Sequence, residues 1–234
     1  APIVYSPVEM YSNTHSFVKI VSGSTRGLVG LKSDGTIWSW GDSSLQTNFD
    51  SAVGTGFGVG QNLAIGNSTS PTRIIGDHSF VDVSGGNAGV LGLKTNGSAW
   101  FFGHTQAIYY PDGDSTNQGI YYPHRLMNEA SYADIAARQS GGGGLRSDGS
   151  AWCWGANNTT GQLGDDCTVS TGVKSFPTSV VGGHSFTRIF GGDVAAGAGG
   201  IMAGLKSNGT VWTWGGNTLG AIGDGTIANR SSPT

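Results

Sequence analysis

The stretch Gly30 to Gly41 reads GLKSDGTIWSWG, and the chain repeats it three more times. The other copies are GLKTNGSAWFFG at Gly92 to Gly103, GLRSDGSAWCWG at Gly144 to Gly155 and GLKSNGTVWTWG at Gly204 to Gly215. The copies start 62, 52 and 60 residues apart, and all seven tryptophans fall inside them. Repeats of this length are too long for helical solenoids and come near the four-strand blade of a β-propeller.

Two shorter markers recur in step with this phrase. A Ser-Phe or Ser-Tyr pair precedes every copy, at Ser16-Phe17, Ser79-Phe80, Ser131-Tyr132 and Ser185-Phe186. A proline stands at the same point of every unit, at Pro7, Pro71, Pro123, Pro177 and Pro233. We therefore divide the chain into four units, approximately residues 7–70, 71–122, 123–176 and 177–234, and expect them to build a single body.

Each copy of the phrase predicts a β-hairpin. An apolar stretch, Leu28 to Leu31 in the first copy, meets a tight turn and then the alternating run Thr36 to Trp40. The turns carry Asp-Gly or Asn-Gly, which tolerate the positive φ angles of a tight hairpin. Aromatic residues two apart point to one face of a strand, so we expect them to fill the space between stacked sheets. These predicted core residues are Trp38, Trp40, Trp100, Phe102, Trp152, Trp154, Trp212 and Trp214.

Two further strands complete each unit. Alternating stretches follow the Ser-Phe pair, for example Phe17 to Val21 and Phe186 to Phe190. Short strands are predicted after the proline, at Thr72 to Ile75 and Thr178 to Val181. Apolar and polar residues alternate as they do in half-buried strands. The predicted fold is all-β, a propeller of four-stranded antiparallel blades.

These phrases, together with NTTGQLGD at Asn158 to Asp165 and NRSSP at Asn229 to Pro233, resemble the repeat of the regulator of chromosome condensation (RCC1-like) family. The resemblance covers nearly the whole chain and implies a β-propeller, usually of seven blades, that acts as an interaction platform. Four units leave three possibilities: a complete small ring, part of a larger propeller, or an assembly of several chains. Because Ser6 to Met10 is in phase with Ser70 to Ile74, the first strand can complete the last blade of the same chain or of the next one.

Composition limits the classes of partner. The chain has 42 glycines, 12 % charged residues and a net charge of −3, and its twelve Lys and Arg are scattered. Nucleic-acid binding needs a basic surface, so we expect none. No apolar run approaches the ~20 residues of a membrane span, so we expect no membrane insertion.

No motif for catalysis or cofactor binding stands out, and we expect no enzyme, no cofactor and no metal. The histidines at His15, His78 and His184 precede the Ser-Phe pair and are expected as repeat residues. The segment Asp112 to Asn117 begins like a calcium loop, but it lacks the glycine and the bidentate glutamate of such a loop. An enzyme that uses the central face of the ring is a third, less favoured possibility.

The two cysteines allow two interpretations. Cys153 and Cys167 could close a disulfide within the third unit. Alternatively, Cys153 is a small core residue. The redox compartment stays open between the two.

Two irregular segments are the predicted partner-binding surfaces. The tetrapeptide IYYP occurs twice around residues 112–119, which brings in Tyr109, Tyr110, Tyr121 and Tyr122. Tyrosine offers a large contact area at low entropy cost and is enriched in interfaces. The alternative is that these tyrosines pack locally to hold a long loop. The second candidate is the segment Gln46 to Gln61, with Phe49 and Phe57.

Two functions from different classes follow. The first is a non-enzymatic module that binds another protein through its irregular loops. The second is a structural subunit of a virus particle or extracellular filament that self-associates head-to-tail, since low charge and abundant small polar residues suit such contacts. That composition favours an extracellular or virus-particle setting over an intracellular one. Whether a small-molecule ligand is bound stays open.

Overall fold

A computed structural model describes residues 16–24, 27–41, 68–74, 76, 79–86, 89–103, 120–126, 131–138, 141–155, 158–167, 174–192 and 200–234. Within these ranges the chain consists of β-strands, turns and one 3₁₀ turn, η2 (Asn158–Thr160). The strands form four antiparallel sheets, here called blades 1 to 4, in which neighbouring strands follow the order of the chain. The all-β architecture agrees with the sequence prediction.

Each blade is a meander that runs from an inner to an outer strand. The strands of blade 1 are β1 (Phe17–Ser24), β2 (Gly27–Lys32), β3 (Ile37–Gly41) and β4 (Ser68–Arg73). Those of blade 2 are β5 (Phe80–Gly85), β6 (Gly89–Lys94), β7 (Ala99–Gly103) and β8 (Ile120–Arg125). Those of blade 3 are β9 (Asp134–Arg138), β10 (Gly141–Leu145), β11 (Ala151–Gly155) and β12 (Lys174–Ser179). Those of blade 4 are β13 (Arg188–Gly192), β14 (Ile201–Leu205) and β15 (Val211–Gly215).

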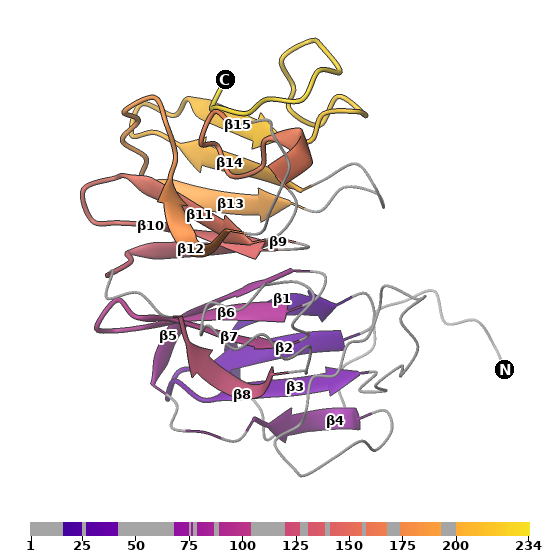
Figure 1. The fold of residues 1–234 in the computed structure, drawn as a ribbon. Coiled ribbons are helices and arrows are strands. Elements are labelled where there is room, and N and C mark those ends of the chain that lie inside the picture. Colours follow the sequence, from indigo (N-terminus) through magenta and orange to yellow (C-terminus); the bar gives the residue numbers. More distant parts are fainter. Residues whose placement is uncertain are drawn as a thin grey trace, which may run out of the picture.

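The blades are arranged in an open arc. The inner strands contact one another in sequence, β1 with β5, β5 with β9 and β9 with β13. Figure 1 shows the strands of blades 1 and 2 in the lower half of the molecule and those of blades 3 and 4 in the upper half. In the described part of the chain, β13 has no comparable contact with β1. The four blades therefore do not close a small ring by themselves.

The repeated phrase forms the hairpin between the second and third strands. In blade 1, Leu31 pairs with Ile37 and Gly30 with Trp38, and the turn glycine Gly35 has a φ of 80°. The Asp34 carboxylate accepts hydrogen bonds from the amide of Thr36 at 2.9 Å and from its hydroxyl at 2.6 Å. The hydroxyl in turn accepts a bond from the Trp38 indole N–H at 3.0 Å. This local network explains why each copy of the phrase has Asp or Asn, then Gly, then Ser or Thr, with Trp two residues later.

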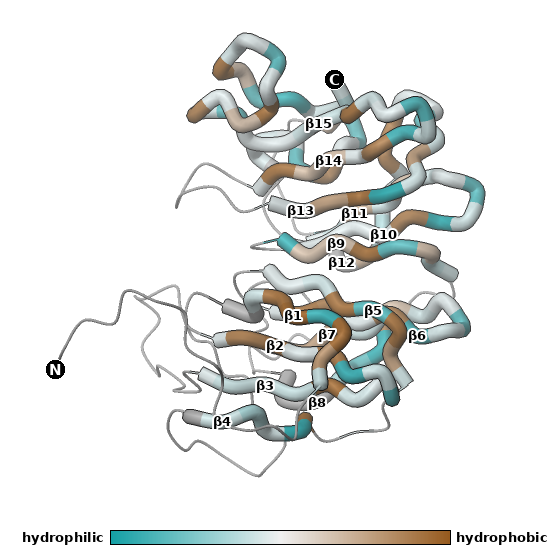
Figure 2. The backbone as a smooth tube through the Cα atoms, turned by 180° about the vertical axis from the view of Figure 1, so that it is seen from behind, coloured by the Kyte–Doolittle hydropathy of each residue, from teal (hydrophilic) through white to brown (hydrophobic). Residues whose placement is uncertain are grey.

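The core lies between blades rather than within one sheet. At each of the three junctions, the later blade presents a backward face, which carries its tryptophans, to the forward face of the blade before it. Between blades 3 and 4, Phe186, Met202 and Trp214 of the backward face pack against Leu145 and Cys153 of the forward face. The other two junctions repeat this pattern with equivalent residues. Figure 2 shows the hydrophobic stretches concentrated in the strands and the hydrophilic ones in many of the turns.

The outer strands correct one detail of the sequence prediction. Pro71, Pro123 and Pro177 lie inside β4, β8 and β12, so these strands begin before the proline and not after it. In blade 1 the pairing with β3 is irregular between Ser68 and Thr72, where Pro71 lies. Proline has no N–H to donate and is tolerated on an edge strand at such an irregularity. Because each of these strands closes the preceding blade, the blades are out of phase with the sequence units by one strand.

Candidate interaction surfaces

The connection between the third and fourth strands leaves every blade at the same point. The glycine that ends the repeated phrase pairs with the first residue of the outer strand, as Gly41 with Ser68, Gly103 with Ile120 and Gly155 with Lys174. In blade 4, Gly215 forms an isolated bridge with Arg230. This point lies at the end of the third strand that is opposite the hairpin turn. All four connections are therefore anchored at one end of the propeller.

Four of the six residues predicted to bind a partner fall on the first two of these connections. Phe49 and Phe57 belong to residues 42–67, and Tyr109 and Tyr110 to residues 104–119, all outside the described part of the chain. Their anchoring strands belong to neighbouring blades 1 and 2. The calcium-like segment Asp112 to Asn117 also lies outside the described residues.

The second IYYP tetrapeptide does not belong to an insert. Tyr121 and Tyr122 lie in β8, the outer strand of blade 2, directly before Pro123. The equivalent residue before Pro177 in β12 is Phe176, an exposed aromatic residue. The outer strand of blade 3 therefore also has an aromatic residue at this position.

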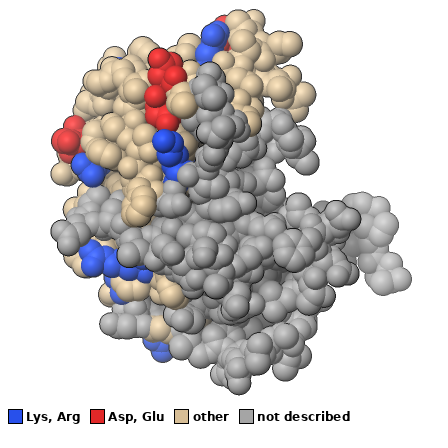
Figure 3. Space-filling view, in the orientation of Figure 1, with Lys and Arg blue, Asp and Glu red and all other residues tan. Residues whose placement is uncertain are grey.

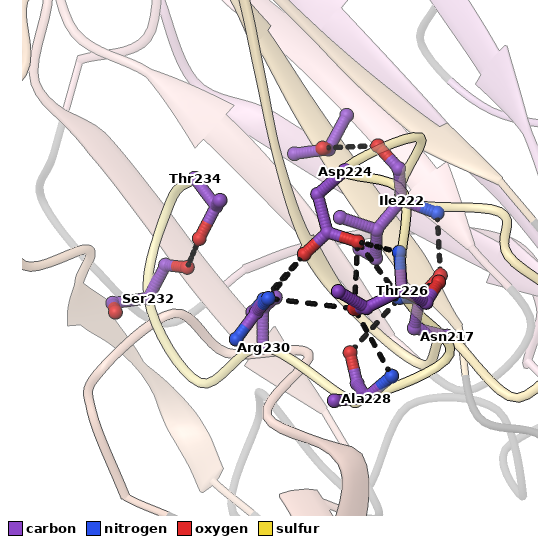
Figure 4. Close-up of polar contacts among 9 residues, drawn as sticks. Asn217, Ile222, Asp224, Thr226, Ala228, Arg230, Ser232 and Thr234 are labelled. Atoms are coloured by element: carbon purple, nitrogen blue, oxygen red, sulfur yellow. Dashed lines mark hydrogen bonds and ion pairs between the residues drawn. The ribbon is translucent and has the colours of Figure 1, made fainter.

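The connection of blade 4 is held together from inside by the buried amide of Asn217 (Figure 4). The Asn217 side-chain N–H groups donate to the carbonyls of Ala228 at 2.9 Å and Thr226 at 3.0 Å. Its side-chain oxygen accepts from the amide of Ile222 at 2.9 Å. One side chain thus ties three points of the connection to each other.

Asp224 provides a second tie. Its carboxylate accepts from the Arg230 guanidinium at 2.6 Å and from the Thr226 hydroxyl at 2.8 Å (Figure 4). These hydrogen bonds, that of Thr226 first, lower the pKa of Asp224 from an ordinary value of 3.8 to about 2. The charged carboxylate is therefore the form that fits this connection.

We expect the conformational order of the segment formed by residues 217–230 to depend on pH. A carboxyl whose pKa is lowered by folding stabilises the folded form above its ordinary pKa, and this contribution is lost as the pH falls towards the folded pKa. Amide resonances of Thr226 and Ile222 should shift between about pH 4 and pH 2 in the wild type. The Asp224→Asn variant should lack this titration, and an unchanged titration in it would contradict the assignment.

The hairpin end of the blades carries a repeated stack of a cation on an indole. Lys32 lies 4.1 Å from the Trp38 ring, Lys94 4.1 Å from Trp100, Arg146 3.9 Å from Trp152 and Lys206 4.4 Å from Trp212. His184 also packs on Trp212, at 4.4 Å between ring centres, and its pKa is lowered by burial and by Lys206. These cationic and aromatic side chains therefore make their contacts with one another, within the repeat. His124 lies in β8, and His15, His78 and His104 lie outside the described residues.

Charged residues join neighbouring inner strands at one repeated position, a feature that the sequence analysis missed. Lys19 lies 2.6 Å from Asp82 of the next blade, and Arg188 lies 2.8 Å from Asp134 of the preceding one. Asp134 also accepts a bond from the amide of Ile189 at 3.0 Å. All four charged residues stand two positions after the aromatic residue of the Ser-Phe or Ser-Tyr marker. That spacing is the signal that could have revealed them.

The cysteines are not joined to each other. Cys153 is buried between blades 3 and 4, no disulfide links it to Cys167, and burial raises the pKa of its thiol to about 12. Cys153 thus lies in the core, and in this structure its sulfur is not bonded to that of Cys167. Packing between two blades excludes water from this thiol, which disfavours the thiolate.

Three further observations concern the described residues. They contain no group of three or more His, Cys, Asp and Glu that could hold a metal ion. None of their helices has the length and apolar character needed to span a bilayer. Figure 3 shows Lys and Arg in separate places on the visible face, with acidic residues between some of them.

No protein-family model matches the chain, but solved structures share its fold. Human WBSCR16 superposes with a TM-score of 0.75 at 18% identity, over 97% of this chain and 54% of that one. Prp20p of Saccharomyces cerevisiae superposes with a TM-score of 0.70 at 15% identity, over 95% of this chain and 51% of that one. Yeast RCC1 (Prp20) in complex with Kap60 gives 0.71 at 15% identity, over 97% and 50%. The chain thus has an RCC1-like propeller fold and spans about half the length of these proteins.

Proposed function

From this RCC1-like fold, we propose that the chain is a non-enzymatic module that binds another protein through the connections between its third and fourth strands. The observation that carries the proposal is their common anchoring. Connections of unequal length and unrelated sequence start and end at equivalent points of a regular scaffold. Binding residues are typically found on loops that a rigid scaffold positions.

Two further facts support a protein as the partner. The connections of blades 1 and 2 supply Phe49, Phe57, Tyr109 and Tyr110, and aromatic residues dominate the energetics of protein interfaces. The structural neighbour Prp20p is described with binding to Gsp1p and histones, and yeast RCC1 is seen bound to Kap60. We infer a protein partner of unspecified identity for this chain.

The proposal is tested with a displayed library of random peptides as the probe. Peptides selected on the wild-type chain should bind the double variant Tyr109→Ala, Tyr110→Ala at least about tenfold more weakly, since interface aromatic residues often contribute more than 1 kcal/mol each. The matched control is Phe176→Ala, which removes an exposed aromatic residue from the outer strand of blade 3 and leaves the connections intact. Its affinity for the peptides should stay at the wild-type value.

The opposite pattern would contradict this function. If the selected peptides bind the tyrosine variant as tightly as the wild type, the connection of blade 2 is not the binding surface. If the corresponding variant Phe49→Ala, Phe57→Ala also keeps full affinity, binding through the predicted loops is wrong. Thermal unfolding of each variant verifies that the fold is retained.

A further inference from the structure

The chain passes from blade 3 to blade 4 through residues 180–187, here called the link. Both ends of the link are bonded to blade 3. The amide of Val181 donates to the carbonyl of Gly164 at 2.8 Å, and the amide of Phe186 donates to the carbonyl of Gly149 at 2.9 Å. The residues between these two bonds are therefore the part of the link that can pack on blade 4.

The side chain of His184 connects the middle of the link to blade 4. Its imidazole packs on the indole of Trp212, with 4.4 Å between ring centres. Gly182 and Gly183 precede it with φ angles of 97° and 59°, which glycine adopts without strain. A Cβ on residue 182 would meet the Nε2 of His184 at 2.6 Å. The backbone of the link thus makes room for the imidazole on Trp212.

The indole of Trp212 is shared with a permanent cation. The Nζ of Lys206 lies 4.4 Å from the centre of the same ring. Burial first, and then the charge of Lys206, lower the pKa of His184 from its ordinary value of 6.5. Both causes disfavour the protonated form. The stacked arrangement therefore fits the neutral imidazole.

The other charged residues around the link are engaged in contacts of their own. They are Arg146 on the indole of Trp152, Asp148 bonded to the amide of Ser150, and Arg188 paired with Asp134. Lys206 is therefore the charge that bears on His184.

We propose that the contact between His184 and Trp212 is a pH-sensitive switch, which holds the link on blade 4 at neutral pH and opens when the imidazole is protonated. The repeat itself does not demand a histidine here, because Ala130 stands at the equivalent position before Ser131. A protonated imidazole is a second cation next to Lys206, and moving into solvent removes their repulsion.

The direction of the effect follows from the lowered pKa of His184. A group that folding keeps neutral stabilises the folded arrangement fully above its ordinary pKa. For His184 this contribution is present above pH 6.5 and is lost as the pH falls from 6.5 towards the folded pKa. The link should therefore be closed at neutral pH and open in mild acid.

NMR spectroscopy of the chain between about pH 7.5 and about pH 5 tests this switch. The imidazole of His184 should titrate with a midpoint below 6.5. The indole N–H of Trp212 and the amides of Gly182 and Gly183 should shift with the same midpoint. In the variant His184→Phe, which keeps an aromatic ring on Trp212 but cannot be protonated, these shifts should be absent.

Hydrogen exchange of the Val181 amide measures the opening itself, because this amide is bonded to Gly164 in the closed link. At about pH 5 the Val181 amide should exchange at least about fivefold faster in the wild type than in His184→Phe. At about pH 7.5 the two proteins should exchange equally. Comparing them at one pH cancels the dependence of intrinsic exchange on pH.

Two substitutions of Lys206 test the competing charge. Lys206→Gln should raise the midpoint of His184 towards 6.5, whereas Lys206→Arg keeps the charge and should leave the midpoint low. The matched control is His124→Gln, which removes a histidine from β8 of blade 2. The titration of His184 should be unchanged in it.

Three results would overturn the proposal. If His184 titrates while the resonances of Trp212 and the link stay fixed, the imidazole is protonated in place. Equal exchange of the Val181 amide in the wild type and in His184→Phe at about pH 5 means that the link does not open. A midpoint that Lys206→Gln leaves unchanged means that Lys206 is not the competing charge.

Discussion

Replacing Trp154 with alanine is expected to lower the free energy of unfolding by about 3–5 kcal/mol, the usual cost of removing a fully buried large aromatic side chain. Trp154 is 1% exposed and packs with Leu91 and Phe101 of the preceding blade. Its ring also lies 5.9 Å from that of Tyr132. The substitution removes the largest side chain of this junction, and the two sheets cannot close over the space without moving their backbones. Urea denaturation followed by circular dichroism measures the loss.

Trp40 provides the matched control because it occupies the same position in blade 1. It stacks on Phe17 at 5.4 Å, but none of the described blades covers its face. Trp40→Ala should cost less than about 2 kcal/mol, since only part of the side chain is buried. Equal losses for Trp40→Ala and Trp154→Ala would contradict the arrangement of the blades.

The second large effect is expected from Gly85→Ala. The inner strands of blades 1 and 2 approach so closely at this point that a Cβ on residue 85 would overlap the carbonyl oxygen of Ser22. A backbone atom cannot move aside as a flexible side chain can. We expect the variant to lose about 3 kcal/mol, at the upper end of the usual cost of over-packing. In blade 4, a Cβ on residue 191 would overlap the carbonyl oxygen of Ala137 in the same way, so Gly191→Ala should be destabilising as well.

The equivalent position of blade 3 is already an alanine, Ala137, which makes the reverse substitution a useful control. Ala137→Gly should cost only about 1 kcal/mol, the backbone entropy difference between the two residues, plus the loss of one methyl group. Thermal unfolding of both variants compares them. If Gly85→Ala unfolds like the wild type, β1 and β5 lie farther apart at residue 85 than they do in the structure.

Local sequence patterns predicted the fold because the turn, the strand and the spacing of the aromatic residues in the repeated phrase all indicate the same β-hairpin. The Asp-Gly or Asn-Gly dipeptide sets the turn, the alternating run sets the strand, and the spacing of the tryptophans puts both on one face. The order of strands in a blade then follows the order of the chain, since consecutive strands usually pair with each other. Such features depend on residues close together in the sequence.

The features that were missed or misplaced depend on contacts between distant residues. The assignment of the Pro71 strand to the preceding blade depends on pairing with β3, which proline phase alone does not reveal. The ion pair between Lys19 and Asp82 joins two blades through residues that are 63 positions apart in the sequence. Likewise, the open arc follows from how far each blade turns relative to its neighbour. No short stretch of sequence records that angle.

The three junctions between described blades use the same two faces, with the tryptophans of each later blade packed on the blade before it. Hydroxyl-radical footprinting of the tryptophans, read by mass spectrometry, tests this arrangement most directly. We predict that Trp154 and Trp214, which are 1% and 0% exposed, are oxidised much more slowly than Trp40, which is only partly buried. Oxidation of Trp154 and Trp214 as fast as Trp40 would contradict this arrangement of the blades.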